Sequence, residues 1–242
     1  MEENPNFKQE ENYSYTIKYI IVGDSSVGKS NILLRYSKNT FDPSHMTTLG
    51  IEFANKKIKY EGINYNIQVW DTAGQESFKS VTRAYYKSSA CAFIVYDITN
   101  EKSFNNIENW IFDCKNLAPS KIQLVLIGNK CDLEDKRQID YETGKNFANL
   151  HNMIFFETSA LSGFNVNKAF MKSIEIIDGN IRNGFYDGED SSLQGIRKMK
   201  NGVEVSGERF INVNKLVNVK KESFYSCCNY GYFFFFFLIC FF

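Results

Sequence analysis

A glycine-rich segment at residues 23–30, GDSSVGKS, contains the residue types that bind a phosphate chain. It fits the pattern G-x-x-x-x-G-K-[ST], in which a turn before a helix aims backbone N–H groups and the helix dipole at one point. We expect Lys29 to reach the β- and γ-phosphates and the Ser30 hydroxyl to ligate Mg²⁺. A chance glycine-rich turn is the alternative. The expected phosphate-loop contacts are Ser25, Ser26, Val27, Gly28, Lys29 and Ser30.

A second segment, WDTAGQE at residues 70–76, follows an apolar run that is typical of a buried strand. There the Asp71 carboxylate could hold Mg²⁺, directly or through a water, and the Gly74 N–H could reach the γ-phosphate. Gln75 suits the orientation of an attacking water better than the role of a base, because an amide barely accepts protons. Phosphoryl transfer depends on such positioning more than on covalent help. The alternative for Gln75 is an exposed turn residue without a catalytic role.

Two further segments, NKCD at residues 129–132 and ETSA at 157–160, have the chemistry to recognise guanine. The Asp132 carboxylate can accept both neighbouring N–H donors of a guanine edge, and adenine would leave it desolvated without partners. The Lys130 stem is expected along the base, Asn129 beside it, and the Ala160 N–H at the guanine carbonyl oxygen. Asp132 could instead, or also, cap the next helix. A phosphate site and a guanine site in one chain predict a GTP-binding protein.

Strand and helix patterns alternate from residue 16 to 179, which indicates an α/β fold with a mostly parallel sheet covered on both faces. All four segments follow predicted strands, so we expect them at one edge of the sheet, where ligands of such folds bind. The predicted strands are residues 17–22, 51–60, 63–70, 90–97, 122–128 and 153–156, with 51–60 and 63–70 forming a hairpin. The predicted helices are residues 30–37, 104–117, 141–150 and 165–177.

Composition limits the other functions. The 242 residues contain 28 Lys plus Arg and 28 Asp plus Glu, so no global basic field favours nucleic acid as a partner. The six cysteines form no C-x-x-C pair and only two histidines are present, so no zinc site is expected and reduced thiols are predicted.

Residues 16–180 resemble a Rab-type small GTPase of the Ras superfamily. The resemblance depends on TLGIEF at 48–53, QESF at 75–78, YYKSSA at 85–90 and the cysteine pair near the end. It implies the P-loop GTPase fold, with a six-stranded sheet, one antiparallel edge strand and about five helices. It also implies a slow GTPase switch in vesicle transport that binds effectors in its GTP form. The expected regulators are an exchange factor, a GTPase-activating protein and a GDP-dissociation inhibitor or escort protein. A monomer on the cytoplasmic face of early secretory or early endosomal membranes, with a cytosolic pool, is expected.

The resemblance also assigns residues. Thr48 would ligate Mg²⁺ only in the GTP form, and Phe41 would pack edge-on against the guanine. Ile51, Phe53, Trp70 and Tyr85 would face effectors, although ordinary packing of the hairpin is the alternative for the aromatic residues. Ser159, Ala160 and Leu161 would line the base, with Leu161 in place of the family's frequent lysine. Ser25 replaces a frequent glycine, and Asn31 a smaller residue beside the α-phosphate.

The flanking segments are predicted to lie outside the GTPase domain. Residues 1–15 are expected to form a disordered arm and residues 181–226 a flexible linker with a local basic excess. The resemblance implies geranylgeranyl groups on Cys227 and Cys228, yet fourteen residues follow them. The apolar run at 232–242 is shorter than the roughly 18–20 residues that span a bilayer. Three explanations stay open: a coding sequence read too far, an interfacial aromatic anchor, or an extension that blocks prenylation.

Two other classes of function stay open from the residues. A pseudo-GTPase scaffold would hold nucleotide without hydrolysing it, although the presence of Gln75 argues against this class. A P-loop kinase or ATPase would bind adenine, which the residues at 129–132 disfavour.

Overall fold

The computed structural model of the chain describes residues 13–44, 51–72, 84–186, 193–200 and 203–204. All of these residues belong to the first of two compact units, residues 1–206; the second comprises residues 207–242. Within the described part of the chain, no helix has the length and apolar character needed to cross a bilayer.

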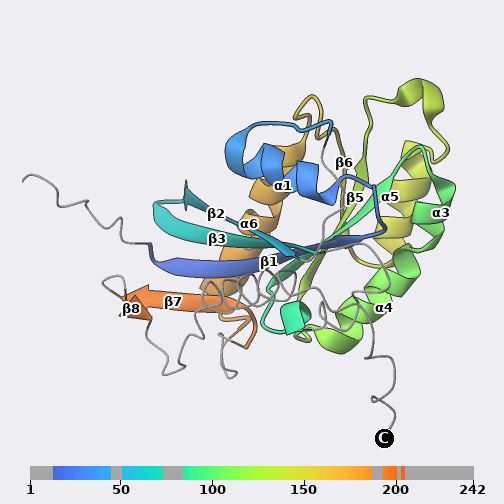
Figure 1. Cartoon of the computed structure of the whole chain (residues 1–242). Coiled ribbons are helices and arrows are strands. Elements are labelled where there is room, and N and C mark those ends of the chain that lie inside the picture. The colour runs from blue at the N-terminus through green and yellow to red at the C-terminus, as the bar shows by residue number, and fades with distance from the viewer. Residues whose placement is uncertain (1–12, 45–50, 73–83, 187–192, 201–202, 205–242) are drawn as a thin grey trace, which may run out of the picture. The chain divides into compact units, whose positions relative to one another are not determined.

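One twisted sheet forms the centre of the first unit, with strand order β2-β3-β1-β4-β5-β6 (Figure 1). Its strands are β1 Tyr15–Gly23, β2 Ile51–Tyr60, β3 Ile63–Thr72, β4 Cys91–Asp97, β5 Gln123–Asn129 and β6 Ile154–Thr158. Neighbouring strands pair in parallel except β2 and β3, which form the predicted antiparallel hairpin at one edge. The predicted mixed sheet with an antiparallel edge strand is confirmed.

Helices cover both faces of the sheet (Figure 1). They are α1 Lys29–Lys38, α3 Glu101–Asn105, α4 Ile107–Leu117, α5 Tyr141–Leu150 and α6 Val166–Arg182, with a short 3₁₀ turn η2 at Glu134–Lys136. Alternate residues of the buried β1 point to opposite faces, so two hydrophobic clusters form. One contains Tyr19 and Phe170 beneath α1 and α6, and Tyr36 of α1 stacks on Phe170 of α6. The other contains Ile20 beside α4 and α5.

A feature that sequence reasoning missed follows α6. The prediction of a flexible linker is wrong for residues 196–200, which form β7 (Ile196–Lys200), followed by β8 (Val203–Glu204). β7 pairs antiparallel with the first residues of β1, next to the place where β4 begins. Ile196 is buried in the cluster beneath α6, although its neighbours are polar and basic. The two apolar residues of β7, Ile196 and Met199, are three positions apart and do not alternate with polar ones, so only the tertiary structure reveals this strand.

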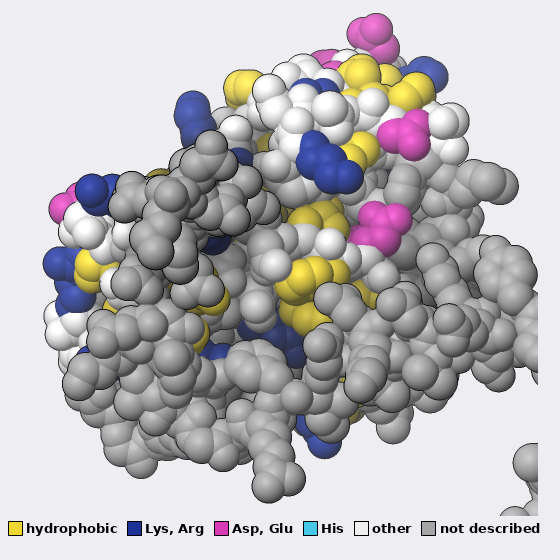
Figure 2. Space-filling view, turned by 60° about the vertical axis from the view of Figure 1, so that its left-hand side comes forward, with side chains coloured by type: hydrophobic (Ala, Val, Ile, Leu, Met, Phe, Trp, Pro, Cys, Tyr) yellow, Lys and Arg dark blue, Asp and Glu magenta, His cyan; other side chains and the backbone are white. Residues whose placement is uncertain are grey.

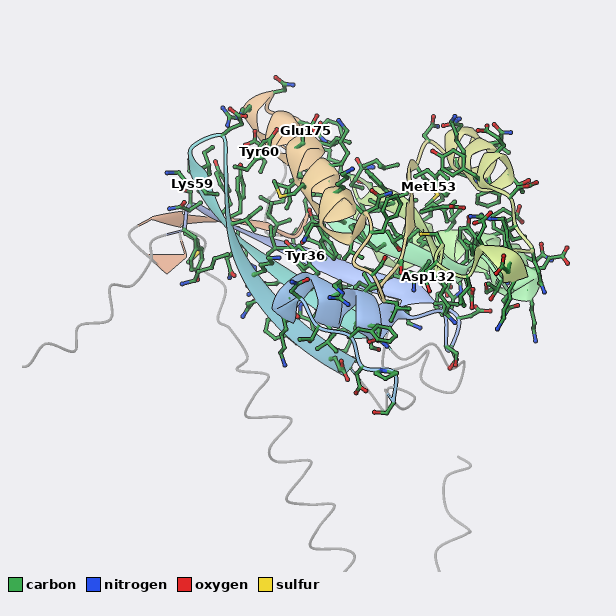
Figure 3. The ribbon with its side chains drawn as sticks, turned by 90° about the horizontal axis from the view of Figure 1, so that it is seen from above. Tyr36, Lys59, Tyr60, Asp132, Met153 and Glu175 are labelled. Atoms are coloured by element: carbon green, nitrogen blue, oxygen red, sulfur yellow. The ribbon has the colours of Figure 1, made fainter. Side chains whose placement is uncertain are left out.

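The parallel strands place the sequence motifs together. Because β1, β3, β4, β5 and β6 run in one direction, the residues after them lie at one edge of the sheet. Figure 3 shows Asp132, which follows β5, at the opposite end of the sheet from Lys59 and Tyr60, the last residues of β2. This edge contains the candidate site.

Candidate nucleotide-binding site

The phosphate loop is a backbone turn that only glycine can make at two positions. Gly23 has φ 143°, and a Cβ there would lie 2.2 Å from the Val95 carbonyl oxygen. Gly28 has φ 98°, and a Cβ there would lie 2.4 Å from Asn129 Nδ2. The two glycines therefore let the loop approach β4 and β5 closely, in a conformation that L residues rarely adopt. Gly28 is directly followed by the start of α1, as the motif predicts.

The Lys29 ammonium is buried at the start of α1 and lies against the loop. It donates to the carbonyl oxygens of Gly23 (3.0 Å) and Asp24 (2.7 Å). Burial lowers the pKa of Lys29, while the nearby Asp71 and Asp24 carboxylates oppose this shift. A desolvated ammonium whose described partners are mainly carbonyl oxygens gains stability from an anion placed beside it. The loop is thus electrostatically suited to a phosphate group.

Ser30 and Asp71 meet beside Lys29. The Ser30 hydroxyl donates to an Asp71 carboxylate oxygen, and both residues are buried. A hydroxyl and a carboxylate are hard oxygen donors of the kind that Mg²⁺ prefers. No group of three or more His, Cys, Asp and Glu side chains that could hold a metal occurs among the described residues. The donor set therefore fits a magnesium ion that completes its shell with phosphate oxygens and water, as Mg²⁺ usually does in nucleotide sites.

The second residue of the phosphate loop, Asp24, is anchored from outside the motif. Its carboxylate accepts hydrogen bonds from Asn106 Nδ2 (2.7 Å) and Trp110 Nε1 (2.8 Å) at the start of α4. Asn106 stands where the predicted helix 104–117 divides into α3 and α4. Sequence reasoning missed this anchor because Asp24 and Trp110 are 86 positions apart and no local spacing connects them. The loop is consequently held on both sides, by β4 and β5 and by α4.

Asn129 joins the phosphate side of the site to its base side. Its side chain is buried and donates to the Val27 carbonyl oxygen (2.9 Å). Its Oδ1 accepts from Thr158 Oγ1 (3.1 Å) and from the Ala160 N–H (3.3 Å). The sequence predicts Asn129 as a guanine contact; the structure shows that it first ties together the loops after β1 and β6. One N–H of the Asn129 amide is left beyond these three bonds.

Lys130 is held by a carboxylate that sequence reasoning did not select. Its ammonium lies 2.6 Å from an Asp97 carboxylate oxygen, and its backbone has φ 66°. Asp97 ends β4 and pairs in register with Asn129, so a strand-end acidic residue next to the motif was the available signal. Asp132 is exposed, and the residue that caps η2 is Leu133, so the predicted capping role of Asp132 is not observed.

The loop after β6 is fixed by two arginines. Arg35 of α1 donates to the carbonyl oxygens of Ala160 (2.8 Å) and Leu161 (2.6 Å). Arg137 makes a bidentate pair with the buried Glu157 at 2.6 and 2.9 Å, and its hydrogen bonds to Glu157 and Glu134 raise its pKa. These contacts, also missed from sequence, hold the loop backbone where Ala160 could meet a base.

Comparisons with known proteins agree with this geometry. A family model described as Ras family matches residues 18–178. The Ras-related protein Rab-2B of Dictyostelium discoideum is 46% identical over 177 residues, which cover 72% of this chain and 88% of that protein. The chain belongs to the Rab small GTPases of the Ras superfamily. It is accordingly a GTP-binding protein that hydrolyses GTP to GDP and acts as a switch in vesicle traffic, together with the family's regulators and effectors.

In this Rab GTPase, two hydrogen bonds join α1 to Asp42, which precedes the predicted magnesium ligand Thr48. Asn31 Nδ2 donates to the Asp42 carbonyl oxygen (3.0 Å), and the Asp42 N–H donates back to Asn31 Oδ1 (2.9 Å). Phe41 is partly buried and packs against the cluster beneath α1 and α6. Its predicted contact with guanine stays a prediction.

The serines predicted to contact the nucleotide differ in exposure. Ser25 is half-buried, and Ser26 is exposed with φ 64° at the turn of the phosphate loop. The Ser159 side chain is buried and accepts a hydrogen bond from the Ser162 N–H (3.0 Å).

Three aromatic residues of the Rab GTPase form a row on one face of the sheet. Phe53 and Trp70 have ring centroids 4.5 Å apart, and Trp70 and Tyr85 5.2 Å apart. Phe53 is 44% exposed, whereas Trp70, Tyr85 and Ile51 are half-buried. The row therefore packs internally and also reaches the surface at Phe53. We call Phe53, Trp70 and Tyr85 the aromatic row.

Some predicted residues lie outside the described residues: Thr48, Gly74, Gln75, Cys227 and Cys228. On the face seen in Figure 2, the described Lys and Arg side chains are scattered rather than gathered in one patch.

Proposed function

We propose that this Rab GTPase binds Mg²⁺·GTP across the edge of the sheet and that the residues named above hold it. The observation that carries the proposal is the buried contact of Ser30 with Asp71, beside the Lys29 ammonium and on the same sheet edge as Asn129. Lys29 and the phosphate-loop N–H groups would hold the β- and γ-phosphates. When bound, magnesium neutralises charge that develops on the phosphates.

The proposed hydrolysis depends on positioning. Ser30, Asp71 and Thr48 would hold the metal, Gly74 would donate its N–H to the γ-phosphate, and Gln75 would orient the attacking water. Arg35 and Arg137, which lie near the base side, are engaged with carbonyl oxygens and carboxylates of the protein itself. A GTPase-activating protein that supplies an arginine would therefore accelerate hydrolysis by about 10³–10⁵.

The test is single-turnover hydrolysis of bound GTP by the full chain and by Gln75→Leu. The substitution should slow hydrolysis by at least about tenfold, because misplacing a reactant costs up to about 10² in rate, while GTP dissociation stays unchanged. Equal rates in both proteins would refute the role of Gln75. A wild-type chain that binds GTP and never hydrolyses it would instead favour the pseudo-GTPase alternative.

We also propose that prenyl groups on Cys227 and Cys228, with the basic residues before them, attach the protein to membranes of the early secretory pathway. One lipid signal alone anchors weakly, so two chains and a basic segment suit stable attachment. The similarity to Rab-2B supports an endomembrane location in that pathway. A fluorescent fusion carrying Cys→Ser at both positions should leave the membranes for the cytosol. An unchanged distribution would refute prenyl attachment.

A further inference from the structure

β7 attaches the segment after α6 to the start of the sheet. Its residues pair with β1 in the register Tyr15 with Lys198, Thr16 with Arg197 and Ile17 with Ile196. Two hydrogen bonds extend the ladder, from the Lys18 N–H to the Gly195 carbonyl oxygen (2.9 Å) and from the Met199 N–H to the Ser14 carbonyl oxygen (2.8 Å). β7 thus fills the place beside β1 that β4 leaves open.

The turn into β7 lies in close contact with the chain that leads into β4. Gly195 has φ 78°, and a Cβ there would lie 2.4 Å from the Ala90 N, 2.6 Å from the Ser88 carbonyl oxygen and 2.7 Å from the Ser89 carbonyl carbon. All three neighbours are backbone atoms, so no side chain could move aside. The same short stretch follows Tyr85 and contains the carbonyl oxygen of Lys87. Docking of β7 and the geometry of residues 85–90 are consequently coupled.

Lys18 connects this contact to the aromatic row. Its backbone N–H binds Gly195 and its carbonyl oxygen accepts from the Ala90 N–H (2.8 Å). Its ammonium donates to the Lys87 carbonyl oxygen (2.7 Å) and lies 5.7 Å from the Trp70 ring centroid and 5.9 Å from that of Tyr85. These separations are within the range of cation–π attraction. One residue therefore touches β7, the stretch before β4 and two members of the row.

We propose that β7 is a positioning strand for the aromatic row: its docking through Gly195 fixes Lys18 and residues 85–90, and so sets the arrangement of Trp70 and Tyr85. The role of the row toward effectors rests on the proposed function, while the coupling itself does not. The segment that leads to the predicted lipid anchor would then contribute to effector recognition through the fold of the domain rather than only as a tether.

The charges around Lys18 agree with such coupling. Burial and, to a smaller extent, the positive charge of Arg197 on β7 together lower the pKa of Lys18 to about 8. An ammonium this close to neutrality depends strongly on its fixed partners, which are the Lys87 carbonyl oxygen and the two rings. Displacement of β7 would remove the Arg197 charge and loosen those partners together.

Gly195→Ala and Gly62→Ala form a matched pair for the test. Gly62, in the turn between β2 and β3, has φ 80°, close to the 78° of Gly195, but a Cβ there meets nothing within 4 Å. The two substitutions thus place alanine at nearly the same φ, and only Gly195→Ala adds the steric conflict. Hydrogen exchange of the full chain should become about tenfold faster at the Lys18 and Met199 amides in Gly195→Ala and stay unchanged in Gly62→Ala.

The spectroscopic readout uses the two tryptophans of the chain, Trp70 and Trp110. With 5-fluorotryptophan incorporated, the ¹⁹F resonance of Trp70 should shift or broaden in Gly195→Ala, while that of Trp110, which donates to Asp24 and has no cation–π contact with Lys18 among the described residues, should change less. Ile196→Ser should reproduce the effect, and Ile196→Val should leave the Trp70 resonance at its wild-type position. An unchanged Trp70 resonance in the Gly195→Ala protein, with Lys18 exchange accelerated, would overturn the proposal.

The functional readout is a pull-down. It follows the protein whose capture by the Gln75→Leu chain most exceeds its capture by the GDP-loaded wild type. Adding Gly195→Ala should weaken its capture by about fivefold or more, the lower end of usual coupling between sites, with nucleotide dissociation unchanged. Adding Gly62→Ala should not. If no protein is enriched, the proposed role of Gln75 fails, and the exchange and ¹⁹F results still decide the role of β7. Full capture by the Gly195→Ala chain would refute its part in effector recognition.

Discussion

Truncation of Asn129 tests whether one buried amide joins the two halves of the nucleotide site. Asn129→Ala removes three hydrogen bonds, to Val27, Thr158 and Ala160. Each bond contributes about 0.5–1.5 kcal/mol net, and the buried polar groups that Asn129 binds would be left without this partner. Two of the bonds are longer than 3.0 Å, so we expect them to contribute at the lower end of this range. We therefore expect the free energy of unfolding to fall by roughly 3 kcal/mol.

The assay is urea unfolding in magnesium at several fixed GDP concentrations. Bound nucleotide adds RT ln(1 + [L]/Kd) to stability, so the dependence on GDP separates lost affinity from lost folding energy. Asn116→Ala is the matched control, because Asn116 is exposed on α4 and its amide donates along the helix to the Phe112 carbonyl oxygen. That variant should stay within about 0.5 kcal/mol of the wild type.

A coincident midpoint for Asn129→Ala and Asn116→Ala would refute the reasoning. GDP dissociation should also accelerate in Asn129→Ala, since the phosphate loop and the loop after β6 would no longer be tied through one side chain. Unchanged dissociation together with lowered stability would limit Asn129 to a structural role.

Two further predictions concern charged partners near and beyond the site. Asp97→Asn should speed GDP dissociation by roughly 5–30-fold, about 1–2 kcal/mol, because the Lys130 ammonium loses its carboxylate; stopped-flow release of a fluorescent GDP analogue measures this, and a rate equal to that of the exposed Asp135→Asn control would contradict it. Lys18→Met tests the lowered pKa: between pH 8 and 10.5 the unfolded wild type binds more protons than the native state, so native stability rises with pH through this window. Between pH 7.5 and 9.5 the wild type should gain about 1–2 kcal/mol relative to Lys18→Met in urea unfolding, and parallel pH profiles would show that Lys18 is not desolvated.

Much of the site could be predicted from sequence because the chemistry of each motif is local. A loop of the pattern found at residues 23–30 can only make its turn with glycine at Gly23 and Gly28, and the structure gives both positive φ values. Alternation of strands and helices then places every motif at one sheet edge, since parallel strands share a direction. The family comparison confirmed the resulting fold and the GTPase switch.

The supporting contacts could not be predicted, because each depends on which residues the fold brings together. Asp24 meets Trp110, and Lys130 meets Asp97, across 86 and 33 positions of sequence. Nothing in the local spacing of these residues distinguishes a partner from a solvated charge.

The sequence by itself determined the ligand, the reaction and the sheet edge that carries the motifs, because these depend on residue types at fixed spacing and on the alternation of strands and helices. The tertiary structure alone decided that Asn129 is a tie between loops and that a charged segment after α6 becomes β7. The physical reason is the same in both cases: Asn129 and Ile196 owe their roles to burial beside distant backbone, where an amide must find partners and an apolar side chain leaves water.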